Sequence, residues 1–378
     1  MVNLKRIVYN IHLILGLVSG IIVFIVAITG STYVFKSEIE NVTQSYRDLK
    51  KPEKSFLPPS RLRSVASDIF PDRTLHGVVY GKPGEAAEVY YYEADPLFYY
   101  GIIVNPYNGE VLKVKNYQKD FFYFMYTGHT RLWMPPAIGE PIVRWGVVIF
   151  VLMLLTGIVL WWPARNAVNK GFRINWKAPW SRRLLDLHSV FGFYALLVLL
   201  VIALTGLVWG FQWFSETVYS ITGGNKEVSF VVPESDTTSR EIMDTDRAVD
   251  SVWRKMLGEY ARTEMIEVHF PHSDEEALYA HVNPDSKTYW KTEFRYFDQN
   301  TLEEIKPGTI WGTMEDASLP GKIRRLNYDI HTGAIGGLPG KILVFFASLI
   351  AASLPVTGFL MWWKKRKEKQ KLKSGLDL

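Results

Sequence analysis

The sequence predicts a helical membrane protein with four transmembrane helices that arise from an internal duplication and two α+β domains outside the membrane. Three observations predict this class. The flanks of the apolar stretches are basic, short motifs recur at constant offsets, and four stretches are almost free of charge. These four reach the roughly 20 residues that a helix needs to cross a bilayer: Ile11–Phe35, Trp145–Trp162, Leu187–Phe214 and Ile342–Trp363.

The first apolar stretch is interpreted as a retained helix. Lys5 and Arg6 precede it, as in a secretory signal peptide, but the stretch is longer than a typical signal core. The residues that follow, Ser31–Lys36, contain no small-x-small cleavage pattern. We therefore expect a membrane helix within residues 1–35.

The basic flanks predict the orientation. Residues 1–10, 163–186 and 364–378 together carry fifteen Lys and Arg against three acids. The positive-inside rule then places both termini and the 163–186 loop in the cytoplasm. Because the basic residues follow the membrane flanks and form no patch on a folded domain, nucleic acid is not an expected partner, whereas the lipid bilayer is.

The same reading divides the chain into eight segments. They are helix 1 (1–35), a first outside domain (36–120), a His-containing segment with helix 2 (121–162), a cytoplasmic loop (163–186), helix 3 (187–214), a second outside domain (215–322), a second His-containing segment with helix 4 (323–363) and a basic tail (364–378).

Each outside domain is predicted to be one helix on a small antiparallel sheet, which is an α+β fold. The expected helices are Ser60–Phe70 and Thr245–Leu257. The expected strands are 75–80, 88–92, 99–104 and 110–114 in the first domain, and 265–270, 277–282, 288–297 and 302–305 in the second.

The duplication is visible in motifs that match at fixed offsets. The first and third helices share four positions at an offset of 176: His12 and His188, Gly16 and Gly192, and Thr29-Gly30 and Thr205-Gly206. The second and fourth helices share Thr156-Gly157 and Thr357-Gly358 at an offset of 201, and His129 and His331 precede them at an offset of 202.

Four of the eight histidines therefore stand at matched positions, and they are the candidate ligand residues. Polar residues at membrane depth are costly and usually functional. A pseudo-twofold axis along the membrane normal would pair His12 with His188 and His129 with His331. The absence of Cys excludes thiolate metal sites and covalent haem attachment.

Two His on facing helices can hold a b-type haem axially, and Gly16, Gly20 and Gly192 would let a flat macrocycle or another helix approach. Zinc or copper at the same pairs stays open, although two His alone make an incomplete site. Met125 and Met134 could ligate beside His129, but residues 325–338 of the second copy contain no Met.

The other candidate features receive structural interpretations. The Thr-Gly pairs are interpreted as helix-packing features. The remaining histidines are predicted to be surface or strand residues: His76, His269, His272 and His281.

The order of these motifs resembles the PepSY-associated transmembrane proteins, a family that includes iron-regulated bacterial inner-membrane proteins and ferric-siderophore reductases. The segment Val104–Val111, which reads Val-Asn-Pro-Tyr-Asn-Gly-Glu-Val, is similar to the strand–turn–strand end of a PepSY domain. Tyr296–Glu303 resembles it more loosely, since it lacks Pro and Gly.

The resemblance implies an inner-membrane oxidoreductase with two periplasmic PepSY-like domains. It implies two b haems with bis-His ligation by His12, His188, His129 and His331. Electrons would pass from a cytoplasmic flavin or reductase, or from membrane quinol, to a periplasmic ferric siderophore or other Fe(III) chelate, releasing Fe(II). Tyr126 and Arg131 would line a substrate vestibule over the outer haem.

Three other functions stay open. A membrane-anchored PepSY binding or regulatory module would need no cofactor. A quinol-linked electron carrier would serve another periplasmic acceptor. A transporter is the third, because duplicated helices are common in transporters.

Overall fold

The computed structural model describes residues 2–49, 55–162, 172–237 and 243–373. The chain forms two compact units. The helical unit comprises residues 1–36, 124–214 and 330–378, and the sheet unit comprises residues 37–123 and 215–329. Arg165, Lys170 and Asp377, which contribute to the predicted orientation, lie outside the described residues.

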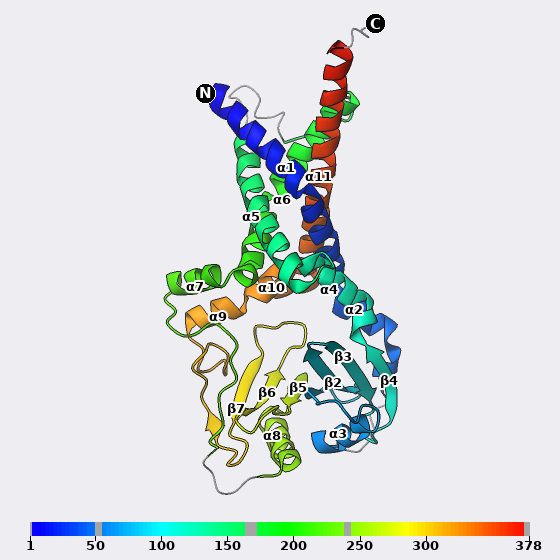
Figure 1. The fold of residues 1–378 in the computed structure, drawn as a ribbon, viewed down its shortest axis with the longest axis vertical. Coiled ribbons are helices and arrows are strands. Elements are labelled where there is room, and N and C mark those ends of the chain that lie inside the picture. The colour runs from blue at the N-terminus through cyan, green and yellow to red at the C-terminus, as the bar shows by residue number, and fades with distance from the viewer. Residues whose placement is uncertain (1, 50–54, 163–171, 238–242, 374–378) are drawn as a thin grey trace. The chain divides into compact units, whose positions relative to one another are not determined.

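The helical unit is built on four long helices, α1 (Val2–Tyr33), α5 (Pro136–Trp161), α6 (Trp180–Gly210) and α11 (Gly337–Lys373) (Figure 1). Each contains a segment that is long and apolar enough to cross a membrane. The helices are neighbours in the order α1, α5, α6, α11, and α11 closes the ring on α1. The four predicted membrane helices are therefore confirmed, and α1 and α6 are diagonal partners across the bundle.

The helices extend past their apolar stretches. α6 begins at Trp180, directly after Pro179, whereas the apolar stretch begins only at Leu187. An ion pair of 3.0 Å between Arg182 and Asp186, four residues apart, stabilises this first part of the helix. The predicted 163–186 loop is accordingly shorter, because its last residues are helical.

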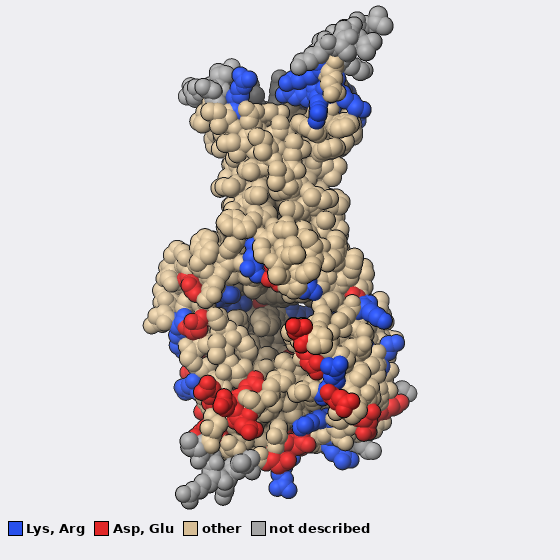
Figure 2. Space-filling view, viewed as in Figure 1, with Lys and Arg blue, Asp and Glu red and all other residues tan. Residues whose placement is uncertain are grey.

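The basic flanks meet at one end of the helical unit. Lys5 Nζ donates to the carbonyl of Trp162 at 3.2 Å, and Lys364 Nζ donates to Ser181 Oγ at 2.5 Å. Lys365 lies over the ring of Tyr9, 5.1 Å from its centre. Figure 2 shows this end of the bundle with Lys and Arg, and the middle of the bundle without charge.

The sheet unit contains one antiparallel sheet with the strand order β4-β3-β2-β1-β5-β6-β7-β8 (Figure 1). The strands are β1 (Gly77–Tyr80), β2 (Ala87–Ala94), β3 (Leu97–Val104), β4 (Val111–Asn116), β5 (Met265–His269), β6 (Leu278–Asn283), β7 (Glu293–Phe297) and β8 (Glu304–Ile305). Both segments predicted as outside domains contribute four strands to this sheet. They join where β1 pairs with β5, with Gly77 opposite His269.

Two helices, α3 (Pro59–Ser67) and α8 (Thr245–Glu259), contact each other and cover one face of the sheet. Asp244 caps α8 by accepting a hydrogen bond from the amide of Arg247 at 3.1 Å. The core includes Leu62, Trp253 and Met256 with residues from both halves of the sheet. One core therefore serves both segments.

Several predicted strands are shorter than expected, and the strand predicted over 288–297 differs most. β7 begins at Glu293, whereas the alternation predicted a strand over 288–297. The amides of Tyr289 and Trp290 instead donate to the carboxylate of Asp329, at 2.9 and 2.8 Å. These donors are engaged by a side chain, so no neighbouring strand is needed to satisfy them.

The remaining elements are short. They are α2 (Lys36–Thr43), α4 (Phe121–Arg131), α7 (Gln212–Ile221), α9 (Leu319–Arg325), α10 (Asn327–Thr332) and the 3₁₀ turns Ser45–Arg47, Tyr117–Lys119 and Ala334–Gly336.

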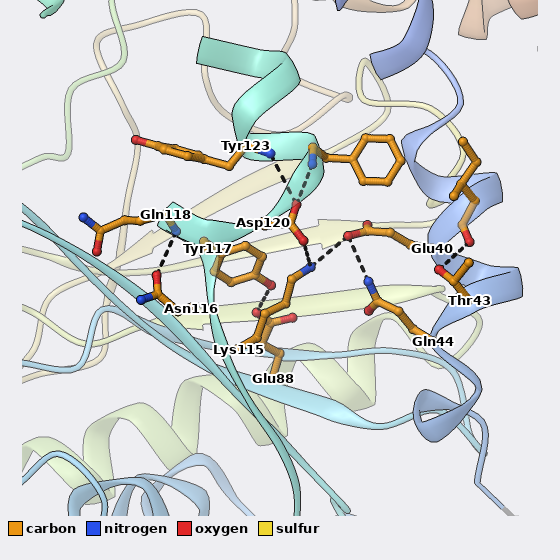
Figure 3. Close-up of polar contacts among 12 residues, drawn as sticks. Glu40, Thr43, Gln44, Glu88, Lys115, Asn116, Tyr117, Gln118, Asp120 and Tyr123 are labelled. Carbon is orange, nitrogen blue, oxygen red and sulfur yellow. Dashed lines mark hydrogen bonds and ion pairs between the residues drawn. The ribbon is translucent and has the colours of Figure 1, made fainter. Parts of the chain in front are cut away.

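A polar network joins α2 to the edge strand β4 (Figure 3). Lys115 Nζ lies 2.9 Å from Glu40 Oε1 and 3.1 Å from Asp120 Oδ2. Asp120 also accepts hydrogen bonds from the amides of Phe122 and Tyr123, at 2.8 and 3.3 Å. Asp120 thereby caps the start of α4, the helix that carries His129.

Candidate functional site

The four histidines at matched sequence positions form two pairs in the helical unit. His12 on α1 and His188 on α6 have ring centres 6.3 Å apart and ring planes at 84°. His129 on α4 and His331 on α10 have ring centres 6.1 Å apart and ring planes at 67°. The structure therefore brings together the same partners that the duplication pairs in the sequence.

Hydrogen bonds at Nδ1 orient the rings of the first pair. His12 Nδ1 lies 2.8 Å from Thr156 Oγ1, and His188 Nδ1 lies 2.9 Å from Thr357 Oγ1. Both threonine hydroxyls donate to carbonyls of their own helices, those of Leu152 and Ser353. Each hydroxyl therefore accepts from the ring, which assigns the proton to Nδ1 and leaves Nε2 with a lone pair.

The second pair is oriented in the same way by backbone carbonyls. His129 Nδ1 lies 2.8 Å from the carbonyl oxygen of Val26. His331 Nδ1 lies 3.0 Å from the carbonyl oxygen of Ile202 and 3.0 Å from Thr205 Oγ1. A carbonyl only accepts, so these rings also carry their proton on Nδ1 and keep Nε2 available as a ligand.

The glycine of each Thr-Gly pair faces one of these rings. A Cβ at Gly157 or Gly358 would lie 3.5 Å from Cε1 of His12 or His188, respectively, and one at Gly206 would lie 3.4 Å from Cε1 of His331. A Cβ at Gly30 would collide with Cε1 of His129 at 2.6 Å. The interpretation of these motifs as packing features alone missed their contact with the histidines.

The separation of the rings suits a metal centre between them. An imidazole bound at about 2.0–2.1 Å has its ring centre roughly 3.2 Å from the metal, so two opposed imidazoles have centres about 6.4 Å apart. The observed 6.3 and 6.1 Å are close to this value. The ring separation in each pair therefore leaves room for one metal ion between the two imidazoles, and their ligation of haem iron stays a prediction.

The glycines proposed to admit a macrocycle pack against helices. A Cβ at Gly16 would lie 2.9 Å from Cε of Met153, and one at Gly20 would lie 3.3 Å from Cβ of Pro355. A Cβ at Gly192 would lie 3.6 Å from Cδ2 of Leu354. Of the two roles considered for these glycines, the structure displays the close approach of another helix.

The candidate vestibule residues lie on the same short helix as His129. Tyr126 and Arg131 both belong to α4, and Tyr126 is exposed. The ring of Tyr126 lies 6.0 Å from that of Tyr33 at the end of α1. Both residues therefore share a helix with His129, and the vestibule and its role in substrate binding stay predictions.

The other four histidines gather in the sheet unit, which the sequence reasoning did not predict. His269 and His281 lie in β5 and β6 as expected, but His269 is buried, with 4% of its surface exposed. The rings of His269 and His281 are centred 4.8 Å apart, and those of His76 and His269 5.1 Å apart. Burial, together with the neighbouring His269 and His272, lowers the pKa of His76 to about 4.

The signal for this second cluster is present in the sequence. Glu267 and His269 alternate on one strand, and such residues share a face. His281 lies on the next strand and is the register partner of Glu267. Only the register shows that the three side chains meet.

The bundle and the sheet define an integral membrane protein with paired histidines among its helices and a large α+β unit. A family model described as the PepSY-associated TM region matches residues 9–365, and the chain belongs to this family. A comparison with curated proteins finds no match. The family membership confirms the resemblance predicted from the motifs.

Proposed function

We propose that this protein is an electron-transfer protein of the bacterial inner membrane that carries two b haems and reduces a periplasmic Fe(III) chelate, such as a ferric siderophore. The observation that carries the proposal is the presence of two closely spaced imidazole pairs, His12 with His188 and His129 with His331. In each pair the Nδ1 atoms are engaged and the ring separation suits one metal ion.

The two pairs are spaced for transfer across a membrane. His12 lies near the start of α1, whereas His129 contacts Val26 near its end. Fourteen residues of α-helix span about 21 Å, a large part of the roughly 30 Å hydrocarbon core. A haem at each pair would supply a one-electron redox centre, and the ligands and their burial would set its potential.

The charge at the helix ends indicates the orientation of the protein in the membrane and hence the direction of electron transfer. The basic end of the helical unit, with Lys5 and Lys364, would face the cytoplasm by the positive-inside rule. The His12–His188 pair would then receive electrons from a cytoplasmic flavin or reductase, or from membrane quinol. The His129–His331 pair and the sheet unit would lie toward the periplasm.

Reduction would release the iron from its carrier. One electron converts Fe(III) to Fe(II), and the lower charge binds hard anionic oxygens less strongly. Tyr126 and Arg131, on the helix that holds His129, would contact the chelate, because an arginine side chain can pair with an anionic ligand. The two copies of the His, Thr-Gly and strand motifs are interpreted as one duplicated unit that builds both haem sites.

The visible spectrum of the purified protein tests this proposal. We expect a sharp α-band of low-spin b haem after dithionite reduction and two haems per chain. His12→Ala and His129→Ala should each lower the haem content to about one per chain by removing one axial ligand. His272→Ala, at an exposed histidine of the sheet unit, is the matched control and should retain both haems.

Two outcomes would contradict the proposal. One is a colourless preparation after expression with added haem. The other is a loaded protein whose haem content is the same in His12→Ala, His129→Ala and the control. If the protein binds haem and can be reduced but reduces no ferric chelate, the proposed haem sites stand and the proposed electron acceptor is wrong.

A further inference from the structure

Five ligand-type side chains meet in the sheet unit. Glu267 and His269 lie two residues apart on β5, and His281 lies opposite Glu267 on β6. His76 precedes β1, and His272 follows β5. The helix-covered face is filled by the alternate residues Ile266 and Val268, so Glu267 and His269 lie on the other face of the sheet.

Glu267, His269 and His281 have the spacing of ligands to one ion. One ligand atom from each residue lies within 4.8 Å of the other two. His269 Nε2 is 3.0 Å from Glu267 Oε1, and His281 Nδ1 is 3.6 Å from Glu267 Oε2. Ligands bound at about 2.1 Å to one metal stand roughly 3.0–3.4 Å apart.

The site contains buried nitrogen atoms whose hydrogen bonding is unsatisfied. The Nε2 atoms of His269 and His281 are buried without a hydrogen-bond partner among the described residues. The 3.0 Å approach of His269 Nε2 to Glu267 therefore brings two atoms together without a well-aligned hydrogen bond. Because unsatisfied buried polar atoms are rare and costly, a missing ligand is the simplest explanation for His269 Nε2, whereas the nitrogen of His281 that approaches Glu267 is Nδ1.

Neighbouring side chains hold the three residues in place. Tyr90 donates a hydrogen bond to Glu267 Oε1, and its hydroxyl lies 3.5 Å from His269 Nδ1. Tyr90 reaches across β1 at Gly77, where a Cβ would lie 3.2 Å from the tyrosine hydroxyl. The ring of Tyr279 stacks on that of His269, with centres 3.9 Å apart.

This arrangement leaves His269 Nε2 as the ligand atom. The Tyr90 hydroxyl gives its proton to Glu267, so its oxygen can accept from Nδ1–H of His269. The proton then stands on Nδ1 and the lone pair on Nε2. Metal-bound histidines are commonly oriented in this way through their second ring nitrogen.

We propose that Glu267, His269 and His281 bind one divalent first-row transition-metal ion. Two imidazoles and one carboxylate suit Zn²⁺ or Fe²⁺, whereas Mg²⁺ and Ca²⁺ prefer sites built from oxygen. Three protein ligands leave at least one position for water or another ligand. A small cavity lined by Phe230, Tyr289 and Trp311 reaches His281 and provides space on that side.

The proposal does not depend on the haem sites, because the three ligands belong to the sheet unit and the paired histidines to the helical unit. Zinc binding can therefore be measured with the haem content as a separate readout. His188→Ala should alter haem and leave zinc binding unchanged.

Zinc is the probe for the test. Full-length protein in detergent is stripped with a chelator and titrated with Zn²⁺ by calorimetry, and bound zinc is counted by elemental analysis. We expect one zinc ion per chain in the wild type and at least about a tenfold loss of affinity in Glu267→Gln, His269→Ala and His281→Ala. Glu264→Gln, just before β5, is the matched acidic control and should bind as the wild type does.

Two wild-type measurements keep the test valid if a buried variant fails to fold. Zinc should raise the Tm of the wild type, because a ligand that binds only the folded state stabilises it. The X-ray absorption spectrum of bound zinc should indicate a coordination shell of nitrogen and oxygen atoms only, with two of the nitrogen ligands belonging to imidazoles. A wild type without stoichiometric zinc, or His269→Ala and His281→Ala variants with unchanged zinc affinity, would overturn the proposal.

Discussion

Each histidine of the His12–His188 pair is held in place by residues of a neighbouring helix. Thr156 and Gly157 on α5 engage His12 on α1, and Thr357 and Gly358 on α11 engage His188 on α6. In each case the hydroxyl holds Nδ1 while the adjacent glycine leaves space for Cε1. A Thr-Gly pair thus places a hydrogen-bond acceptor and a small residue beside the ring, although a Cβ at Gly157 or Gly358 would make only an ordinary contact with Cε1 at 3.5 Å.

Gly30 is the most restrictive of these glycines. A Cβ at Gly30 would lie 2.6 Å from His129 Cε1, whereas one at Gly157 would lie 3.5 Å from His12 Cε1, an ordinary contact. We expect Gly30→Ala to displace His129 and to destabilise the protein by about 1–3 kcal/mol. Gly157→Ala is the matched control and should change stability by less than about 1 kcal/mol.

Thermal unfolding in detergent and the haem content of both variants measure this difference. Gly30→Ala should lose about one haem per chain if His129 is a ligand, and Gly157→Ala should lose none. Equal Tm values for the two variants would show that His129 can move without cost and would contradict the prediction.

Two turns of the sheet unit share one hydrogen-bond pattern at the element scale. In the first, the amide of Gly109 donates to the carbonyl of Asn105, and the amide of Asn105 donates to that of Glu110. In the second, the amide of Leu302 donates to the carbonyl of Asp298, and the amide of Asp298 donates to the carbonyl of Glu303. The segment that resembles the PepSY turn only loosely in sequence therefore has the same backbone connections.

The left-handed position of this turn is filled differently. Gly109 has φ +78°, and Leu302 has φ +59°. A non-glycine residue there costs roughly 1–2 kcal/mol. The second turn is supported by the carboxylate of Asp298, which accepts from the amides of Asn300 and Thr301 at 2.9 and 2.8 Å.

Asp298 gives this turn a pH dependence. Burial would raise the pKa of Asp298, but hydrogen bonds from the amides of Thr301, Asp236 and Asn300 lower it below its usual value of 3.8. A lowered folded-state pKa stabilises the protein above the unfolded pKa, and this stabilisation is lost as the pH falls through the folded value. The contribution should therefore begin to fall below about pH 4 and be lost completely only when the pH is below the lowered folded-state pKa.

Asp298→Asn isolates this contribution. The side-chain amide oxygen of the variant can still accept a hydrogen bond, as Asn105 Oδ1 does in the first turn, but the bond from the amide of Asp236 to Oδ2 is lost. We expect the variant to be about 1 kcal/mol less stable than the wild type at pH 7, with a smaller difference at pH 3. Thermal unfolding at both pH values measures this, and a difference that is the same at pH 3 would refute the role of the carboxylate.

The orientation of the whole molecule can be tested because the chain contains no cysteine. We expect Gly258→Cys, in the sheet unit, to react from the periplasmic side with a membrane-impermeant maleimide. Trp176→Cys, which is 67% exposed in the segment before α6, should react only after the cells are lysed. The positive-inside rule is the reason for this expectation, and the opposite labelling pattern would reverse the proposed direction of electron transfer.

At the same scale, the joined sheet explains how two distant segments form one unit. β1 and β5 pair along Gly77–Tyr80, and α3 meets α8 through hydrogen bonds of Ser60 to Asp250 at 3.0 and 2.7 Å. Both contacts link residues separated by more than 150 positions in the sequence. Sequence periodicity predicts each strand, but it cannot predict which strand will cover an open edge.

The sequence by itself determined the four membrane helices, most strands and the matched positions of four histidines, because hydrophobicity and repetition are properties of the chain. Only the tertiary structure decided which Thr and Gly meet each ring, and that His76, His269, His272 and His281 gather beside Glu267. These contacts depend on strand register and on helix neighbours, which bring together residues whose spacing along the chain carries no such information.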